Sequence, residues 1–167
     1  FPSWLKESPA TDVDRAALAR YARVTEDVLQ AYDAFSFQTI FQAVNEFMTV
    51  DLSAFYLDVS KDRLYTFGAD SRERRSAQTA QYVIADGLTR LVAPILSVTA
   101  DEIWQHLPGA RETSVHLADF PAGVAAWRDP ELEARWARLR EIRGVVNGHL
   151  EVARAQKVIG SALEARV

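Results

Sequence analysis

The sequence of 167 residues contains no cysteine. A disulfide, a thiolate zinc site and a cysteine nucleophile are therefore excluded, and the composition fits a reducing compartment, for which we expect the cytoplasm. No run of about 18 apolar residues occurs, and the opening FPSWLKESPA has no apolar run behind a basic patch, so neither a membrane span nor a secretion signal is predicted. Because the chain begins with Phe1 and ends in the segment SALEARV, we expect it to be a piece of a longer polypeptide.

The residues that usually carry catalysis or bind cofactors are sparse. The seven glycines are scattered singly, so no glycine-rich phosphate loop is present. The three histidines, His106, His116 and His149, do not fall at metal-ligand spacing. The carboxylate pairs Asp12 with Asp14 and Asp101 with Glu102 occur where helix N-termini favour negative charge, and we interpret them as capping residues. No catalytic residue, cofactor site or metal site is predicted for this chain.

Apolar residues make up 49% of the sequence and charged residues 25%, the balance of a soluble globular domain. The formal net charge is -4, so any binding of nucleic acid must come from a local basic patch. The basic excess lies toward the C-terminal half, where arginines crowd the last helical segment.

Apolar residues recur at helical spacing along most of the chain. The pattern and its caps predict an all-α fold, a bundle of about five helices, with residues 1–127 as the main bundle and residues 128–167 as a long C-terminal helix with a short extended segment. The expected helices cover residues 12–33, a stretch from 37, a separate helix from about 52 to 68 capped by Asp51, a stretch from 71 to a break at Pro94, a short helix with a Thr99/Glu102 capping box, and 130–157 after the cap Asp129.

The same spacing predicts which large side chains form the core. We assign to it Trp104, Trp136 and six aromatic residues between positions 35 and 56, in preference to a stacking platform for bases; these six are Phe35, Phe37, Phe41, Phe47, Phe55 and Tyr56. The last helix is expected to face the bundle with Leu132, Trp136, Leu139, Ile142, Val146, Leu150 and Val152.

Four ordered segments resemble the isoleucyl-tRNA synthetases of bacteria. They are DLSAFYLDVSKDRLY at 51–65, RRSAQTA at 74–80, LTRLVAPILSVTADEIWQHLPG at 88–109 and KVIGSALEARV at 157–167. The similarity covers nearly the whole chain. Valyl- and leucyl-tRNA synthetases share the plan and stay as alternatives within the family, although KDRLY favours the isoleucine enzymes because valyl enzymes tend to have Lys-Pro at Lys61-Asp62.

The resemblance implies the helical bundle that holds the anticodon stem and loop of isoleucine tRNA, so that a catalytic domain elsewhere in the parent can aminoacylate it. The ATP-handling signatures, the editing domain and the cysteines of a terminal zinc module have no counterpart here, so ATP, and zinc if the parent has that module, are expected to bind elsewhere in the parent. We expect a monomer whose partners are tRNA and the catalytic and C-terminal domains of the same polypeptide. A helical protein-interaction module and an independent enzyme are the alternatives from other classes.

Exposed basic residues are the candidates for contacts with RNA phosphates. We nominate Lys61, Arg63, Arg72, Arg74 and Arg75 first, and Arg138 and Arg143 second. The alternative is that these charges only solvate helix faces, or that Arg63 or Arg75 pairs with Asp58 or Glu73 inside the bundle.

Overall fold

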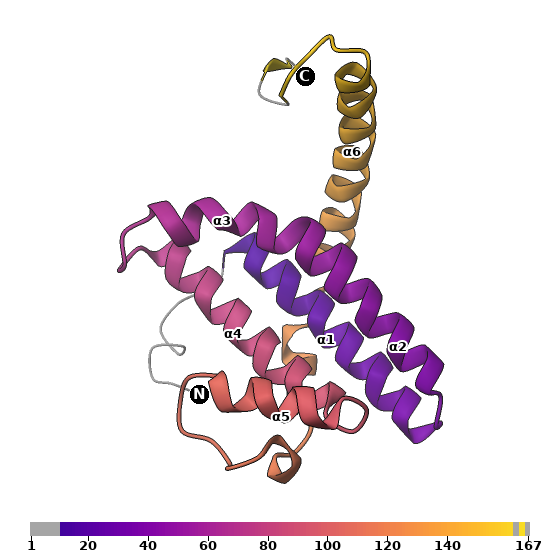
Figure 1. Cartoon of the computed structure of the whole chain (residues 1–167), viewed down its shortest axis with the longest axis vertical. Helices are drawn as coiled ribbons and strands as arrows, with labels where there is room; N and C mark the ends of the chain where they lie inside the picture. The colour runs from indigo at the N-terminus through magenta and orange to yellow at the C-terminus, as the bar shows by residue number, and fades with distance from the viewer. Residues whose placement is uncertain (1–10, 162–163, 166–167) are drawn as a thin grey trace. The chain divides into compact units, whose positions relative to one another are not determined.

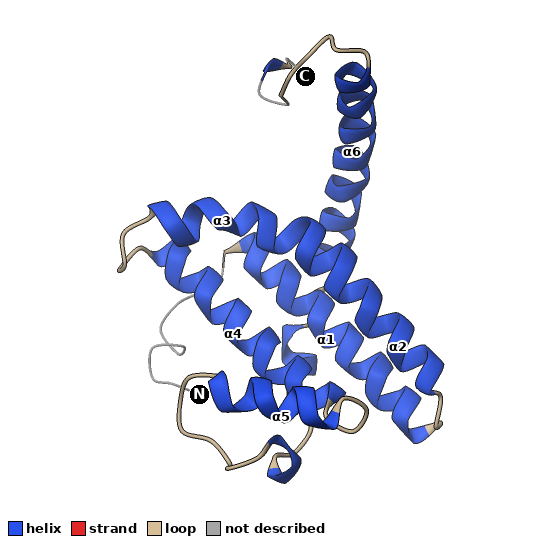
Figure 2. Ribbon diagram, in the orientation of Figure 1, coloured by secondary structure: helices blue, strands red, loops and turns tan. Residues whose placement is uncertain are grey.

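The computed structural model describes residues 11–161 and 164–165, and every regular element within them is helical (Figure 2). The all-α prediction is therefore confirmed. The helices are α1 (Asp12–Asp33), α2 (Phe37–Glu46), the π-helix η2 (Phe47–Tyr56), α3 (Leu57–Thr66), α4 (Arg72–Val92), α5 (Ser97–His106), the 3₁₀ turns η3 (Val115–Leu117) and η4 (Val124–Trp127), and α6 (Pro130–Ala155). Since α2, η2 and α3 follow one another without a break, they form one long helix, and the described residues contain five main helices.

The chain divides into two compact units, one ending at Arg128 and the other beginning at Asp129. In the first unit, α1 packs against both α2 and α4 and contacts η4 (Figure 1). Its buried face consists of apolar residues at helical spacing, so local periodicity and tertiary packing agree. The main core is built from α1, the long α2–α3 helix and α4, with Leu18, Tyr21, Val24, Val28, Ile40, Val44, Phe47, Tyr56, Val83, Ile84 and Leu91 at its centre.

The predicted break at Asp51 is wrong, because the helix continues through this residue as a π-helix. Phe47 and Tyr56 are both buried, although nine residues amount to about 2.5 turns of an α-helix and would place them on opposite faces. The wider i→i+5 turns of the π-helix bring them to the same face. Asp51 caps nothing; it is buried, and its carboxylate accepts a hydrogen bond from Arg20 Nε at 2.7 Å.

Three of the eight aromatic residues assigned to the core lie outside it. Phe35, Phe37 and Phe41 are exposed by 79%, 54% and 63%. Phe35 lies in the turn after α1 with φ at +52°, while Phe37 and Phe41 are one turn apart on α2, where, among the described residues, only the Phe37 ring has an aromatic neighbour on α1, Tyr32 at 6.5 Å between ring centres. The apolar stripe of this helix is thus wider than the surface of the neighbouring helix.

The break predicted at Pro94 is confirmed, since α4 ends at Val92 and the Val92 carbonyl oxygen accepts hydrogen bonds from the Ile95 and Leu96 amides. The predicted Thr99/Glu102 capping box is wrong, because α5 already begins at Ser97 and Thr99 lies within it. Trp104 of α5 is buried as predicted and centres a second, smaller core cluster.

Asp101 connects α5 to the following loop and does not act as a helix cap. Its Oδ1 atom accepts hydrogen bonds from Ser114 Oγ at 2.6 Å and from the Val115 amide at 3.0 Å. The Ser114 hydroxyl, followed by the Val115 amide, lowers the pKa of Asp101. The carboxyl group therefore stays ionised at neutral pH and holds η3 against α5.

In the second unit, α6 begins as predicted, with Pro130 in its first turn and the Asp129 carboxylate accepting from the Leu132 amide at 3.0 Å. The apolar side chains of α6 that were expected to be buried against the bundle are buried only in part. Leu132 is buried, Trp136 is half-buried, and Leu139, Ile142 and Val152 are exposed by about half. The helix ends at Ala155 and residues up to 161 form turns. Part of the extended segment predicted after them lies outside the described residues.

Gly87 of α4 lies directly against the Tyr21 side chain of α1, and we predict that an alanine there destabilises the protein. A Cβ atom at Gly87 would lie 1.6 Å from the hydroxyl oxygen of Tyr21. Tyr21 is only 1% exposed and has no room to move aside. Overpacking of this kind costs about 1–3 kcal/mol, whereas the higher helix propensity of alanine returns only about 1 kcal/mol.

The matched control is Gly144→Ala in α6, where an added Cβ meets nothing within 4 Å. Urea denaturation should show a lower free energy of unfolding for Gly87→Ala and a slightly higher one for Gly144→Ala. Equal stabilisation by both substitutions would contradict the close approach.

Candidate RNA interface

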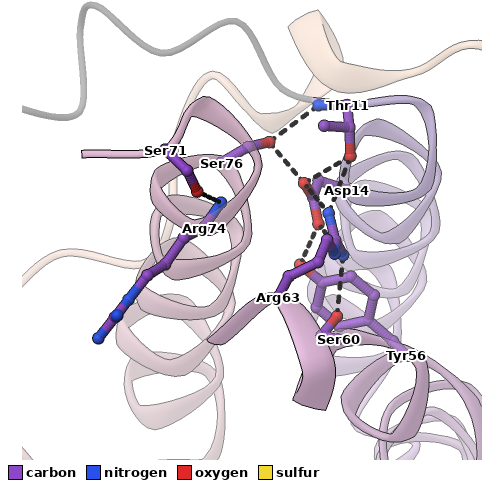
Figure 3. Close-up of polar contacts among 8 residues, drawn as sticks. All are labelled: Thr11, Asp14, Tyr56, Ser60, Arg63, Ser71, Arg74 and Ser76. Atoms are coloured by element: carbon purple, nitrogen blue, oxygen red, sulfur yellow. Dashed lines mark hydrogen bonds and ion pairs between the residues drawn. The ribbon is translucent and has the colours of Figure 1, made fainter. Parts of the chain in front are cut away.

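A buried polar network joins the beginning of α1, the end of the long helix and the beginning of α4 (Figure 3). At its centre is Asp14, whose side chain is 0% exposed. Arg63 holds this carboxylate with two hydrogen bonds, from Nη1 to Oδ2 at 3.0 Å and from Nη2 to Oδ1 at 3.1 Å. Tyr56 and Thr11 donate their hydroxyls to it at 2.7 Å, and Ser76 donates to Oδ2. Asp14 is therefore a buried ionic centre and not a helix cap.

Tyr56 remains a hydrogen-bond donor in this network. Burial raises the pKa of its phenol, and the neighbouring Asp14 carboxylate raises it further. The phenol consequently stays protonated, with its O–H directed at Asp14 Oδ1. Both oxygens of the carboxylate thus have fixed donors, as a buried charge requires.

Arg63 lies inside the bundle and not on its surface. Its side chain is 13% exposed, and besides Asp14 its guanidinium donates to Ser60 Oγ and Thr11 Oγ1, each at 3.1 Å. The alternative that Arg63 pairs within the bundle is the one the structure shows, although the partner is Asp14 and neither Asp58 nor Glu73. We leave Arg63 out of the RNA contacts proposed below.

The network also fixes the first turns of α4, which carry three of the nominated arginines. Ser76 of α4 contacts Asp14, and the Ser71 hydroxyl caps the helix by accepting from the Arg74 amide at 3.1 Å. Because both ends of the segment 71–76 are anchored, the arginines between them project from a rigid support. Figure 3 shows the Arg74 side chain pointing away from the network.

The three arginines of this turn differ in their surroundings. Arg72 is exposed, and no partner for its side chain is found among residues 11–161 and 164–165. Arg74 donates from Nη1 to the Phe67 carbonyl oxygen at 2.9 Å, so part of its guanidinium is already used. Arg75 is half-buried and lines an open cleft. Arg72 and Arg75 are therefore the best placed of the three to donate hydrogen bonds to a phosphate group.

Two of the three remaining nominees, Lys61 and Arg138, are surface cations with acidic neighbours. Lys61 on α3 is exposed and pairs with Asp58 at 3.1 Å. Arg138 on α6 is exposed and pairs with Glu141 at 2.6 Å, while Arg143 on the same helix is half-buried. Exposed pairs of this kind contribute about 0–1 kcal/mol, so a phosphate can replace the acidic partner at little cost.

The open cleft beside α4 was not predicted from the sequence. It has a volume of about 550 Å³ and is lined by polar side chains of α4, by the loop before α4 and by the loop after α5, namely Ala69, Asp70, Arg75, Gln78, Gln81, Tyr82 and Pro108. Arg75, Gln78 and Tyr82 recur at spacings of three and four, which is the only sequence signal for a shared polar face.

Neither a metal-ligand cluster nor a membrane-spanning helix is found in the part of the chain that the structure describes. No group of three His, Asp or Glu side chains there is arranged to hold a metal ion. None of the described helices is long and apolar enough to cross a membrane.

Comparison with known proteins identifies the family. A family model described as the anticodon-binding domain of tRNA ligase matches residues 14–167. Curated relatives include the isoleucine–tRNA ligases of Syntrophotalea carbinolica, 51% identical over 93% of this chain, of Geobacter sulfurreducens, 48% identical over 94%, and of Staphylococcus carnosus, 46% identical over 96%. The chain spans 17% of the length of each of these relatives.

The resemblance read from the four sequence segments is thereby confirmed. The family match begins at Asp14, the centre of the buried network, and runs through both compact units. The chain belongs to the family of anticodon-binding domains of tRNA ligases.

Proposed function

We propose that this chain binds the anticodon stem and loop of isoleucine tRNA as part of a longer isoleucine–tRNA ligase. The observation that carries the proposal is the match of residues 14–167 to the anticodon-binding family, together with relatives that are isoleucine–tRNA ligases. Holding the anticodon arm would place the distant acceptor end of the tRNA at a catalytic domain that lies elsewhere in the parent. ATP, and zinc where the parent has it, would be bound outside this chain.

The basic turn, defined here as Arg72, Arg74 and Arg75, is the proposed phosphate contact, together with Lys61 on α3. These guanidinium and ammonium groups form charge-assisted hydrogen bonds with phosphate oxygens. Unlike Arg63, Arg72 is directed to solvent, and its helix is held in place by the Asp14 network. Arg138 and Arg143 on α6 are the second proposed contact. We further infer a monomer that works in the cytoplasm.

The test is a titration of the chain with isoleucine tRNA and with a non-cognate tRNA, followed by fluorescence anisotropy at two salt concentrations. If four cations contact phosphates, raising the salt fourfold should weaken binding roughly 50- to 150-fold, because each neutralised phosphate releases counterions. Preference for the isoleucine tRNA would place anticodon recognition within these residues.

Equal binding of both tRNAs would reduce the role of the chain to holding the stem. The absence of binding even at low salt would contradict the proposal for the chain by itself. A protein-interaction module, the alternative from another class, predicts this last result, and the exposed side chains of Phe35, Phe37 and Phe41 are the observation in its favour.

A further inference from the structure

The cleft beside the basic turn has polar groups that lack partners. The Gln81 Nε2 atom is buried and has no hydrogen-bond partner among the described residues. The Arg75 side chain likewise has no partner there, and Gln78 is exposed at the same face of α4. A buried amide without a partner is unfavourable, and native proteins rarely contain one unless water or a ligand supplies the missing bond.

Hydrogen bonds hold the part of the cleft lining that Tyr82 of α4 and Pro108 form. The Tyr82 hydroxyl donates to the Pro108 carbonyl oxygen at 3.1 Å, and Arg111 Nη2 donates to both oxygens, at 3.0 Å and 2.5 Å. The Arg111 guanidinium in turn lies 4.5 Å from the centre of the Trp104 ring, which is itself buried in the second core cluster. The position of Tyr82 is therefore set before any ligand arrives, as a specific site requires.

The chemistry of the lining matches one ligand class. Arg75 suits a phosphate, while the amides of Gln78 and Gln81 each offer a donor and an acceptor, as the edge of a nucleobase does. Asp70 accepts only, which suits a base amino group and disfavours a ligand that is entirely anionic. The volume of about 550 Å³ lies within the range of roughly 300–1,000 Å³ that small ligands occupy.

We infer that the cleft binds a single unpaired nucleotide of the RNA, with its phosphate at Arg75 and the edge of its base at Gln78 and Gln81. This inference rests on the proposed function. Unpaired loop bases leave their stack and are read by hydrogen bonds to their edges, whereas paired bases of a stem cannot reach such a cleft. The cleft would thus add base recognition to the phosphate contacts of the basic turn.

The experiment compares the RNA affinity of the variant Gln78→Ala/Gln81→Ala with that of the unsubstituted chain. The ligands are the anticodon stem-loop of isoleucine tRNA and a series of stem-loops that each lack one loop base. The unsubstituted chain should bind about 10-fold more weakly when one particular base is removed from the stem-loop. The variant should show the same loss of affinity with the intact loop. The variant should lose nothing more when that base is missing. The single variant Gln78→Ala, at an exposed position, should show part of the effect without any risk to folding.

The matched control is Gln38→Ala/Gln42→Ala, two exposed glutamines of α2, which should bind every stem-loop as the unsubstituted chain does. The inference is overturned if the cleft variant binds the intact loop as tightly as the unsubstituted chain, or if it weakens every stem-loop equally. In both cases the unsubstituted chain still binds the stem-loop and the proposed function stands. Failure of the unsubstituted chain to bind any stem-loop overturns the proposed function and the inference together.

Discussion

Replacing Asp14 by alanine is expected to lower the free energy of unfolding by about 3–5 kcal/mol, because it removes one partner of a buried ion pair and leaves the other charged. Arg63 would lose both of its hydrogen bonds to the carboxylate, and Tyr56 and Ser76 would lose their acceptor. For a protein of this size, a loss of this magnitude corresponds to a melting temperature lower by roughly 6–20 °C. Thermal and urea denaturation monitored by circular dichroism would measure it.

The control is Asp12→Ala, which removes an exposed carboxylate two residues away, 3.6 Å from Arg15, and should cost about 0–1 kcal/mol. The double variant Asp14→Ala/Arg63→Met should be less destabilised than the sum of the single variants, because no unpaired charge stays buried. Additive effects would contradict the pairing. The variant Arg63→Met should be less stable, but under conditions in which it is folded it should bind RNA as tightly as the unsubstituted chain.

Reversing two charges of the basic turn, in Arg72→Glu/Arg75→Glu, is expected to weaken tRNA binding about 100-fold, since two charge-assisted hydrogen bonds to phosphate are lost. The slope of log affinity against log salt should also become shallower by about one for each contact removed. Arg74 is left unchanged because its guanidinium donates to the Phe67 carbonyl oxygen, so its loss would mix a structural effect with the electrostatic one. Anisotropy titrations at several salt concentrations give both quantities.

The matched variant Arg23→Glu/Arg154→Glu produces the same change in net charge at two exposed arginines of α1 and α6 that were not nominated. It should weaken binding much less and leave the salt slope nearly unchanged. An equal loss of affinity in both double variants would mean that RNA binding depends only on the net charge of the chain. The basic turn would then be excluded as a specific contact.

Local patterns in the sequence predicted the regular structure. The bounds of α1 and α6, the break at Pro94 and the Asp129 cap all depend on residues within a few positions of one another, and all agree with the structure. The family could also be recognised from the sequence, because four ordered segments carry it regardless of how they fold. Helix type was predictable for the same reason, except at Asp51, where burial of both Phe47 and Tyr56 requires a π-helix.

The candidate site could be predicted only in part, since charge is visible in a sequence but partners distant in sequence are not. Arg72, Arg74 and Arg75 were found because they are adjacent, whereas the partner of Arg63 lies 49 positions away on α1. The cleft escaped prediction because its walls come from α4, from the loop before it and from the loop after α5. Periodicity, caps and family thus followed from the sequence itself; the tertiary structure decided which arginine is buried and which polar groups share a cleft, because both depend on how the helices pack.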